Sequence, residues 1–221
     1  MPLDREVTAF DWVPPFAQGL VRDLRVRWAL EEAGLGYRAR LLSAIEPRPA
    51  EYYDEQPFGQ VPAYREGDLR LFESGAIVLH IAESCEALMP RDPVGRTRTV
   101  SWVIAALNSV EPRIMELGTI DVFSAGEEWA RLRRPAVVEA VRARLGNVAD
   151  WLGGEDYLED RFTAGDLMMT TMLRMLRATD LVAERPELAA YQARCEARPA
   201  FARALAAQMR DFAEPEPAGA R

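Results

Sequence analysis

The first part of the chain carries two hydrophobic periods in alternation. Apolar residues recur at every second position at 7–9 and again at 37–41, which is the period of a half-buried strand. Between these runs, Leu20, Leu24 and Trp28 recur every four residues, and Gly34 is a natural C-terminal stop for a helix. The pattern predicts a strand, an amphipathic helix and a second strand.

A second group of elements follows a proline-rich stretch. Two short extended runs at 61–64 and 69–72 flank residues 66–68, which include the glycine and acid expected of a hairpin turn. A helical pattern over 75–85 comes next, and Ser74 is a typical N-cap for it. The order predicted for this second group is strand, strand, helix.

Strand signals nearly disappear in the remainder of the chain. Two prolines and a glycine in residues 89–95 interrupt the pattern, and helical periodicity takes over beyond them. The predicted helices cover residues 96–117, 127–152, 163–178, 186–196 and 199–212.

The change in pattern predicts two domains. We expect an α/β domain over residues 1–87, a linker over 88–97 and an all-helical domain over 98–213. The tail at 214–221 is polar and rich in proline, so we expect it to be disordered. A chain of 221 residues with 49% hydrophobic side chains is long enough to bury two modest cores.

Charge and composition exclude several classes of function. The 35 acidic groups outnumber the 27 basic ones, giving a net charge of −8 that would repel a phosphate backbone, so nucleic-acid binding is not expected. No apolar run has the length of a membrane span, and the first ten residues lack the pattern of a signal peptide, which predicts a cytoplasmic protein. Cys85 and Cys195 form no CxxC pair and His80 is the sole histidine, so neither a disulfide framework nor a metal site is expected.

Three local motifs occur in a fixed order along the chain. They are Gln56-Pro57-Phe58-Gly59-Gln60-Val61-Pro62, then Glu73-Ser74-Gly75-Ala76-Ile77, and finally Phe162-Thr163-Ala164-Gly165-Asp166-Leu167. Together they resemble the cytosolic glutathione transferase family over nearly the whole chain, and we expect a bacterial-type member of unassigned class. The resemblance implies a thioredoxin-like α/β N-terminal domain that binds glutathione, followed by an all-α C-terminal helical bundle.

The first two motifs are similar to the family's glutathione site. By this resemblance, a cis Val61-Pro62 bond would leave the Val61 backbone to pair with the cysteinyl unit, and Gln60 would donate to the glycyl carboxylate. Glu73 and Ser74 have the charge and the hydroxyl that suit the ammonium and carboxylate of the γ-glutamyl end. The local alternatives are a trans Pro62 that starts an edge strand, a solvated Glu73, a Ser74 that only caps its helix and a Gln60 that is merely exposed.

The third motif has a structural interpretation. Thr163 and Asp166 have the spacing of a capping box at the head of an apolar helical run. We therefore expect Asp166 to support the folding of the helical half and not to touch substrate. The methionines at 168–175 are expected to fill the core of that half.

The group that usually activates the glutathione sulfur is missing from its usual place. Ser, Tyr, Cys and Thr are absent from residues 9–36, and Gly19 or Leu20 stands where the family has its hydroxyl. Lowering a thiol pKa by about two units needs about 2.7 kcal/mol, whereas a helix N-terminus supplies about 0.3 to 1. The candidate second donors are the Gln18 amide, the Trp12 indole, the Arg22 guanidinium and the backbone N–H groups of residues 19–21, and the catalytic group is left unassigned.

Three functions are compatible with these features. The leading hypothesis is a glutathione transferase that couples glutathione, as co-substrate, to a small hydrophobic electrophile. The alternatives are a glutathione-dependent disulfide reductase and a non-catalytic interaction module with the transferase fold. By resemblance to the family we also expect a homodimer, with Trp102, Ile104, Leu107 and Val110 either near its seam or in the core of their own domain.

Overall fold

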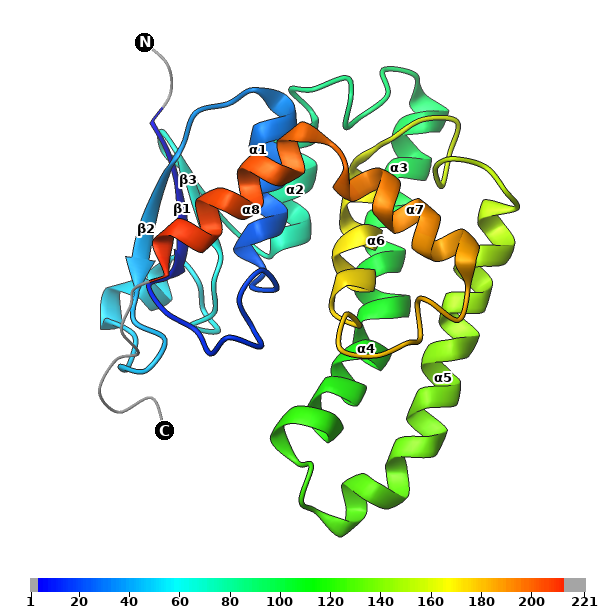
Figure 1. Ribbon diagram of the computed structural model, residues 1–221. Helices are drawn as coiled ribbons and strands as arrows, with labels where there is room; N and C mark the ends of the chain where they lie inside the picture. The colour runs from blue at the N-terminus through cyan, green and yellow to red at the C-terminus, as the bar shows by residue number, and fades with distance from the viewer. Residues whose placement is uncertain (1–3, 213–221) are drawn as a thin grey trace. The chain divides into compact units, whose positions relative to one another are not determined.

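The computed structural model describes residues 4–212, and its chain divides into two compact units. The first unit combines the residues up to Met89 with those from Ala197 onward, and the second covers Pro90–Glu196. Figure 1 traces both units along the chain. The tail at 214–221, for which disorder was predicted, lies outside the described residues.

The first unit is built on a four-stranded sheet with the order β2-β1-β3-β4. Its strands are β1 (Arg5–Phe10), β2 (Arg38–Leu42), β3 (Ala63–Glu66) and β4 (Leu69–Phe72). β1 pairs parallel with β2 and antiparallel with β3, which in turn pairs antiparallel with β4. Because β1 has a neighbour on each side, its residues Val7 and Thr8 are almost fully buried. This mixed sheet confirms the predicted thioredoxin-like fold class.

Two helices of this unit were predicted from the sequence. They are α1 (Asp23–Ala33) and α2 (Ser74–Ala82), which pack against each other, and a 3-10 turn, η1 (Ala50–Asp54), follows β2. α1 ends at Gly34, whose φ of 65° is the left-handed cap expected there. Gly19, just before the helical pattern in the sequence, has a φ of 76°, which a right-handed helix cannot contain, and α1 begins at Asp23.

The last helix, α8 (Pro199–Asp211), belongs to the first unit. Figure 1 shows it running alongside α1, where the Phe201 ring meets Trp28 edge-on with 4.8 Å between ring centroids. Arg198 also pairs with Glu32 at 2.6 Å. The structure therefore differs from the predicted division, which placed residues 98–213 in one helical domain, because the apolar and charged partners of α8 lie on α1.

The second unit is helical throughout its regular structure. Its elements are α3 (Pro93–Ala105), the π-helical turn η2 (Ala106–Val110), α4 (Glu111–Gly118), the π-helical turn η3 (Thr119–Phe123), α5 (Glu128–Leu152), α6 (Ala164–Arg174) and α7 (Pro186–Glu196). α3 starts at Pro93 because the Asp92 carboxylate caps it, accepting from the Gly95 N–H at 2.7 Å. Across residues 4–212, no helix is both long and apolar enough to cross a membrane.

The core of the second unit lies where α3 packs against α6. Met168, Met169 and Met172 have no exposed surface, which confirms that these methionines fill the core. The four residues considered for a dimer seam have different environments: Val110 is 3% exposed, Ile104 is 45% exposed, and Trp102 and Leu107 are intermediate. Ile104 is therefore the one of these four with a largely free apolar surface in the single chain.

Two helix-associated glycines are expected to respond to alanine in opposite directions. Neither Gly34 nor Gly118 has an atom within 4 Å of the position that a Cβ would take. Gly34 has a left-handed φ, so Gly34→Ala is expected to lower the unfolding free energy by about 1 kcal/mol. Gly118 has a helical φ of −60°, so Gly118→Ala is expected to raise it by about 0.5 to 1 kcal/mol. Urea denaturation of both variants measures the change in unfolding free energy. Changes of the same sign in the two variants would contradict the explanation from backbone φ.

Candidate functional site

The β3–β4 hairpin brings the two predicted glutathione motifs together. Ala63 at the start of β3 lies opposite Phe72 at the end of β4. The residues just outside this pair are therefore neighbours, which places Val61-Pro62 beside Glu73-Ser74. The peptide bond between Val61 and Pro62 is cis.

Val61 has an unusual backbone position for a buried residue. It is only 6% exposed, yet it lies two residues before β3 and takes no part in the pairing of the sheet. Within the described part of the chain, neither its N–H nor its C=O has a hydrogen-bond partner. Gln60 is exposed beside it. Unpaired backbone groups just before a strand can pair with an extended peptide ligand.

The start of α2 supplies hydrogen-bond donors near Val61-Pro62. The Ile77 N–H donates to the Glu73 carbonyl at 3.0 Å, so the N–H groups of the preceding turn have no carbonyl to reach within the helix. The Ser74 hydroxyl accepts a hydrogen bond from Arg25 Nη1 at 3.1 Å, and both residues are buried. The arrangement combines N–H groups, a hydroxyl and a guanidinium, which together suit a carboxylate.

Sequence reasoning missed the part that Arg25 plays. Its contact with Ser74 joins α1 to α2 across 49 positions of the chain. A buried arginine two residues after a helix start has no local signal that names its partner. Its position in the interior, at 2% exposure, is the feature that the structure adds.

Glu73 stands at the end of β4 with a strained backbone. Its φ of 66° and ψ of 113° make it the non-glycine residue with positive φ in the described chain. The residue is exposed. Such a conformation costs about 1 to 3 kcal/mol and is characteristic of ligand-binding positions.

Several groups in the loop before α1 that could donate a hydrogen bond to the glutathione sulfur already have partners within the protein. The Leu20 N–H already donates to the Ala17 carbonyl at 3.0 Å, and the Gln18 amide donates to the Val13 carbonyl at 3.4 Å. Thr8, the hydroxyl nearest in sequence, is buried in the sheet, where it accepts from the Ala63 N–H at 2.6 Å. The structure therefore gives Thr8 a different role and leaves the activating group unassigned.

The third motif is the capping box that the sequence predicted. Thr163 caps α6, and the Asp166 carboxylate accepts from the N–H groups of Thr163 at 2.8 Å and Leu158 at 2.9 Å. The Tyr191 hydroxyl donates to the same carboxylate at 3.0 Å. Burial raises the pKa of Asp166 above its usual value, against the opposing effect of these hydrogen bonds. Asp166 thus anchors a loop and two helices of the second unit.

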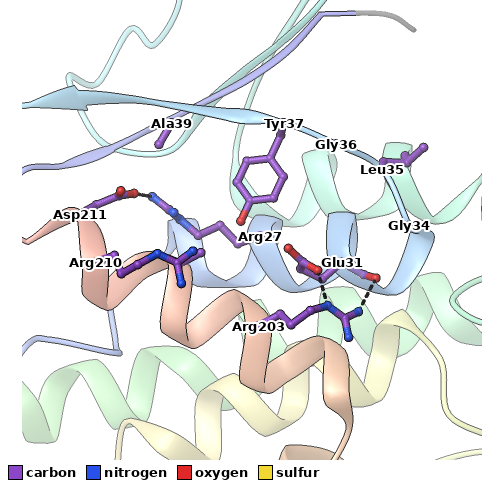
Figure 2. A pocket seen from close by; sticks show the side chains of 11 residues that line it. Arg27, Glu31, Gly34, Leu35, Gly36, Tyr37, Ala39, Arg203, Arg210 and Asp211 are labelled. Atoms are coloured by element: carbon purple, nitrogen blue, oxygen red, sulfur yellow. Dashed lines mark hydrogen bonds and ion pairs between the residues drawn. The ribbon is translucent and has the colours of Figure 1, made fainter.

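A cavity of about 540 Å³ lies elsewhere in the first unit, between α8 and the segment from the end of α1 into β2. Figure 2 shows Tyr37 next to Arg27 in its lining, and Arg203 bonded to Glu31. None of the predicted glutathione residues lines this cavity. Arg27 pairs with Asp211 at 2.6 Å and Arg203 with Glu31 at 2.7 Å, so these two cations are neutralised within the cavity wall.

Two family models match this chain, one over each of its two halves. The model of the glutathione S-transferase N-terminal domain matches residues 7–83, and that of the glutathione S-transferase C-terminal domain matches residues 125–199. The glutathione S-transferase APIC of Nicotiana tabacum is 31% identical over 202 residues, covering 82% of this chain and 91% of the relative. Glutathione S-transferase 4 of Zea mays is 29% identical and covers 88% and 89%. These curated relatives are plant proteins and do not support the bacterial-type assignment.

Solved structures agree on the fold. A glutathione transferase family member from Pseudomonas fluorescens, solved with two glutathione bound, has a TM-score of 0.81 at 24% identity and covers 93% of each chain. The glutathione transferase of Burkholderia graminis, with two glutathione molecules per subunit, has a TM-score of 0.80 at 25% identity, covering 91% of this chain and 87% of its own. The domain matches, the level of identity and the fold agree: the chain belongs to the glutathione S-transferase family.

Proposed function

We propose that this protein is a glutathione transferase that joins the glutathione thiolate to a small hydrophobic electrophile. The observation that carries the proposal is the register of the β3–β4 hairpin, which sets Val61-Pro62 beside Glu73-Ser74. Glutathione is an extended peptide with a zwitterionic end, and these two pairs offer free backbone groups and complementary charges. The names of the relatives, and the glutathione bound by structural neighbours, support the same co-substrate.

Each predicted residue has a role in this proposal. The Val61 N–H and C=O would pair with the cysteinyl unit, and Pro62 fixes the direction of the backbone that presents them. Ser74 and the start of α2 would bind the γ-glutamyl carboxylate, while the Glu73 carboxylate would bind the ammonium. Gln60 would donate its side-chain amide to the glycyl carboxylate.

Isothermal titration of the full chain with glutathione tests the binding part of the proposal. We expect a single site with a dissociation constant in the range of about 1 mM or below. Absence of binding up to several millimolar would exclude this proposal. Turnover of an aromatic halide, followed by its absorbance, tests the transfer step.

A glutathione-dependent disulfide reductase is the second candidate. It is favoured by the absence of any Ser, Tyr, Cys or Thr in residues 9–36 and by the engagement of Thr8 inside the sheet. In a reductase the bound glutathione supplies the sulfur chemistry, so a protein hydroxyl is not required. Faster turnover of a small mixed disulfide than of an aromatic halide would favour it over the transferase.

We also propose a cytoplasmic homodimer. The supporting feature is the set of exposed apolar side chains on α3, namely Val94, Val100 and Ile104. Sedimentation analysis that finds only a monomer at micromolar concentration would count against the dimer. The bacterial-type class, which the plant relatives do not support, would be tested by a sequence comparison across the plant and bacterial classes.

A further inference from the structure

Two buried hydroxyls connect both ends of the segment at 60–63, which contains Val61-Pro62. The Tyr52 hydroxyl donates to the Gln60 carbonyl at 2.6 Å, and the Thr8 hydroxyl accepts from the Ala63 N–H at 2.6 Å. The two hydroxyl oxygens lie 2.9 Å apart. Tyr52 and Thr8 are each 1% exposed. The segment is therefore held before and after Val61-Pro62 by one connected set of hydrogen bonds.

The donors and acceptors in this set can be assigned. A carbonyl oxygen only accepts, so the single proton of the Tyr52 hydroxyl is directed at Gln60. The contact between Tyr52 and Thr8 then uses the proton of Thr8, whose oxygen receives the Ala63 N–H. These three bonds point the same way, from Ala63 through Thr8 and Tyr52 to Gln60, and the Thr8 proton has a longer second contact, of 3.4 Å, with the Ala63 carbonyl. Hydrogen bonds aligned in this way reinforce one another in a buried site.

We propose that Tyr52 and Thr8 are positioning residues for glutathione, which hold the Val61 backbone in the place where it pairs with the peptide. This inference rests on the proposed function, because it concerns the same site. Neither side chain touches the ligand in this proposal. Their effect on binding is indirect, through the peptide groups on either side of Val61-Pro62.

The Tyr52 hydroxyl has a function separate from the packing of its ring. Arg40 stacks over the ring with its guanidinium carbon 5.6 Å from the centroid, and this contact does not need the hydroxyl. Burial raises the pKa of Tyr52, so the hydroxyl keeps its proton at neutral pH and stays a donor. A phenylalanine would keep the ring in place and would release the Gln60 carbonyl.

Thr8 offers a complementary pair of changes. Serine keeps the hydroxyl that accepts from Ala63 and donates to Tyr52, whereas valine has nearly the same shape and no hydroxyl. Tyr37 provides a matched control for Tyr52, because its buried hydroxyl has no hydrogen-bond partner within residues 4–212. Tyr37→Phe therefore removes an oxygen without breaking a described bond.

The experiment measures glutathione binding by titration and steady-state kinetics with an aromatic halide, using full-length protein. Tyr52→Phe and Thr8→Val are each expected to weaken glutathione binding about fivefold, the effect of one buried hydrogen bond. The KM for the aromatic halide should change less than about twofold, because the segment concerned contacts only glutathione. Thr8→Ser and Tyr37→Phe should bind glutathione as the wild type does.

The outcomes separate this inference from the function on which it rests. Wild-type protein that does not bind glutathione overturns both the proposed function and the positioning role. Wild-type protein that binds, together with Tyr52→Phe within twofold of it, overturns the positioning role alone. Equal losses in Tyr52→Phe and Tyr37→Phe also overturn it, because they would show general destabilisation. A double variant, Thr8→Val with Tyr52→Phe, that is no weaker than either single change supports one connected set.

Discussion

Asp166→Ala is expected to lower the free energy of unfolding by about 4 kcal/mol, because it leaves four buried donors without this acceptor. These donors are the N–H groups of Leu158 and Thr163 and the hydroxyls of Thr163 and Tyr191. Each lost partner costs about 1 to 3 kcal/mol when the donor stays buried. Urea denaturation followed by tryptophan fluorescence measures the change, since Trp102 and Trp151 lie in the same unit.

Two further variants show whether the hydrogen bonds of Asp166 account for the loss of unfolding free energy. Tyr191→Phe removes one donor and is expected to cost about 1 kcal/mol. Asp160→Ala removes an exposed carboxylate from the same loop and should change the unfolding free energy by less than about 0.5 kcal/mol. Folded Asp166→Ala should bind glutathione with unchanged affinity, because the glutathione residues lie in the first unit. A loss below about 1 kcal/mol would contradict the role of Asp166 as an anchor.

Glu73→Gln is expected to weaken glutathione binding about tenfold, or about 1.4 kcal/mol. The substitution keeps the size of the side chain and removes the charge proposed to meet the ammonium group. Because the residue is exposed, the loss should shrink as ionic strength rises. Titration calorimetry at low and at physiological salt measures both effects.

Asp68→Asn is the control for the change in net charge. Asp68 is exposed in the turn between β3 and β4, in the same unit as Glu73. A direct contact with the ligand predicts that only Glu73→Gln weakens binding. Equal losses of glutathione affinity in the two variants would indicate a long-range electrostatic effect of net charge. That result would contradict a direct contact between Glu73 and glutathione.

Glu73→Gly separates the backbone of this residue from its side chain. Glycine adopts a φ of 66° without the steric cost that glutamate has there, so the variant is expected to be more stable by about 1 kcal/mol. It should bind glutathione as poorly as Glu73→Gln, because both lack the carboxylate. Thermal denaturation and glutathione titration of the same samples test whether the variant is more stable and binds glutathione more weakly. A variant less stable than the wild type would mean that φ is not strained.

Much of the fold could be predicted because its signals are local. The left-handed cap at Gly34, the capping box of Thr163 and Asp166, and the hairpin between β3 and β4 each depend on a few neighbouring residues. The spacing of hydrophobic residues then distinguishes strands, with a period of about 2 residues, from helices, with a period of about 3.6 residues. Local chemistry of this kind is present in the sequence itself, and the structure places the elements in the predicted order.

The glutathione residues were predicted by their resemblance to a family, and their proximity follows from the hairpin. The buried groups behind them were not predicted. Arg25 contacts Ser74 across 49 positions, and Thr8 contacts Tyr52 across 44, so no local pattern links either pair. A buried arginine or tyrosine looks the same in sequence whatever its partner is.

The sequence by itself determined the order of the elements, through short-range spacing, and the family and the motif residues of the first unit, through resemblance. Only the tertiary structure decided where α8 packs and how the segment at 60–63 is held. The Gln208 amide of α8 donates a hydrogen bond to Asp23 at 2.7 Å, across 185 positions of the chain. The connected hydrogen bonds of Thr8, Tyr52 and Gln60 likewise join three separate segments. Contacts between distant residues form only once the chain has folded, and they depend on burial and geometry that no stretch of sequence contains.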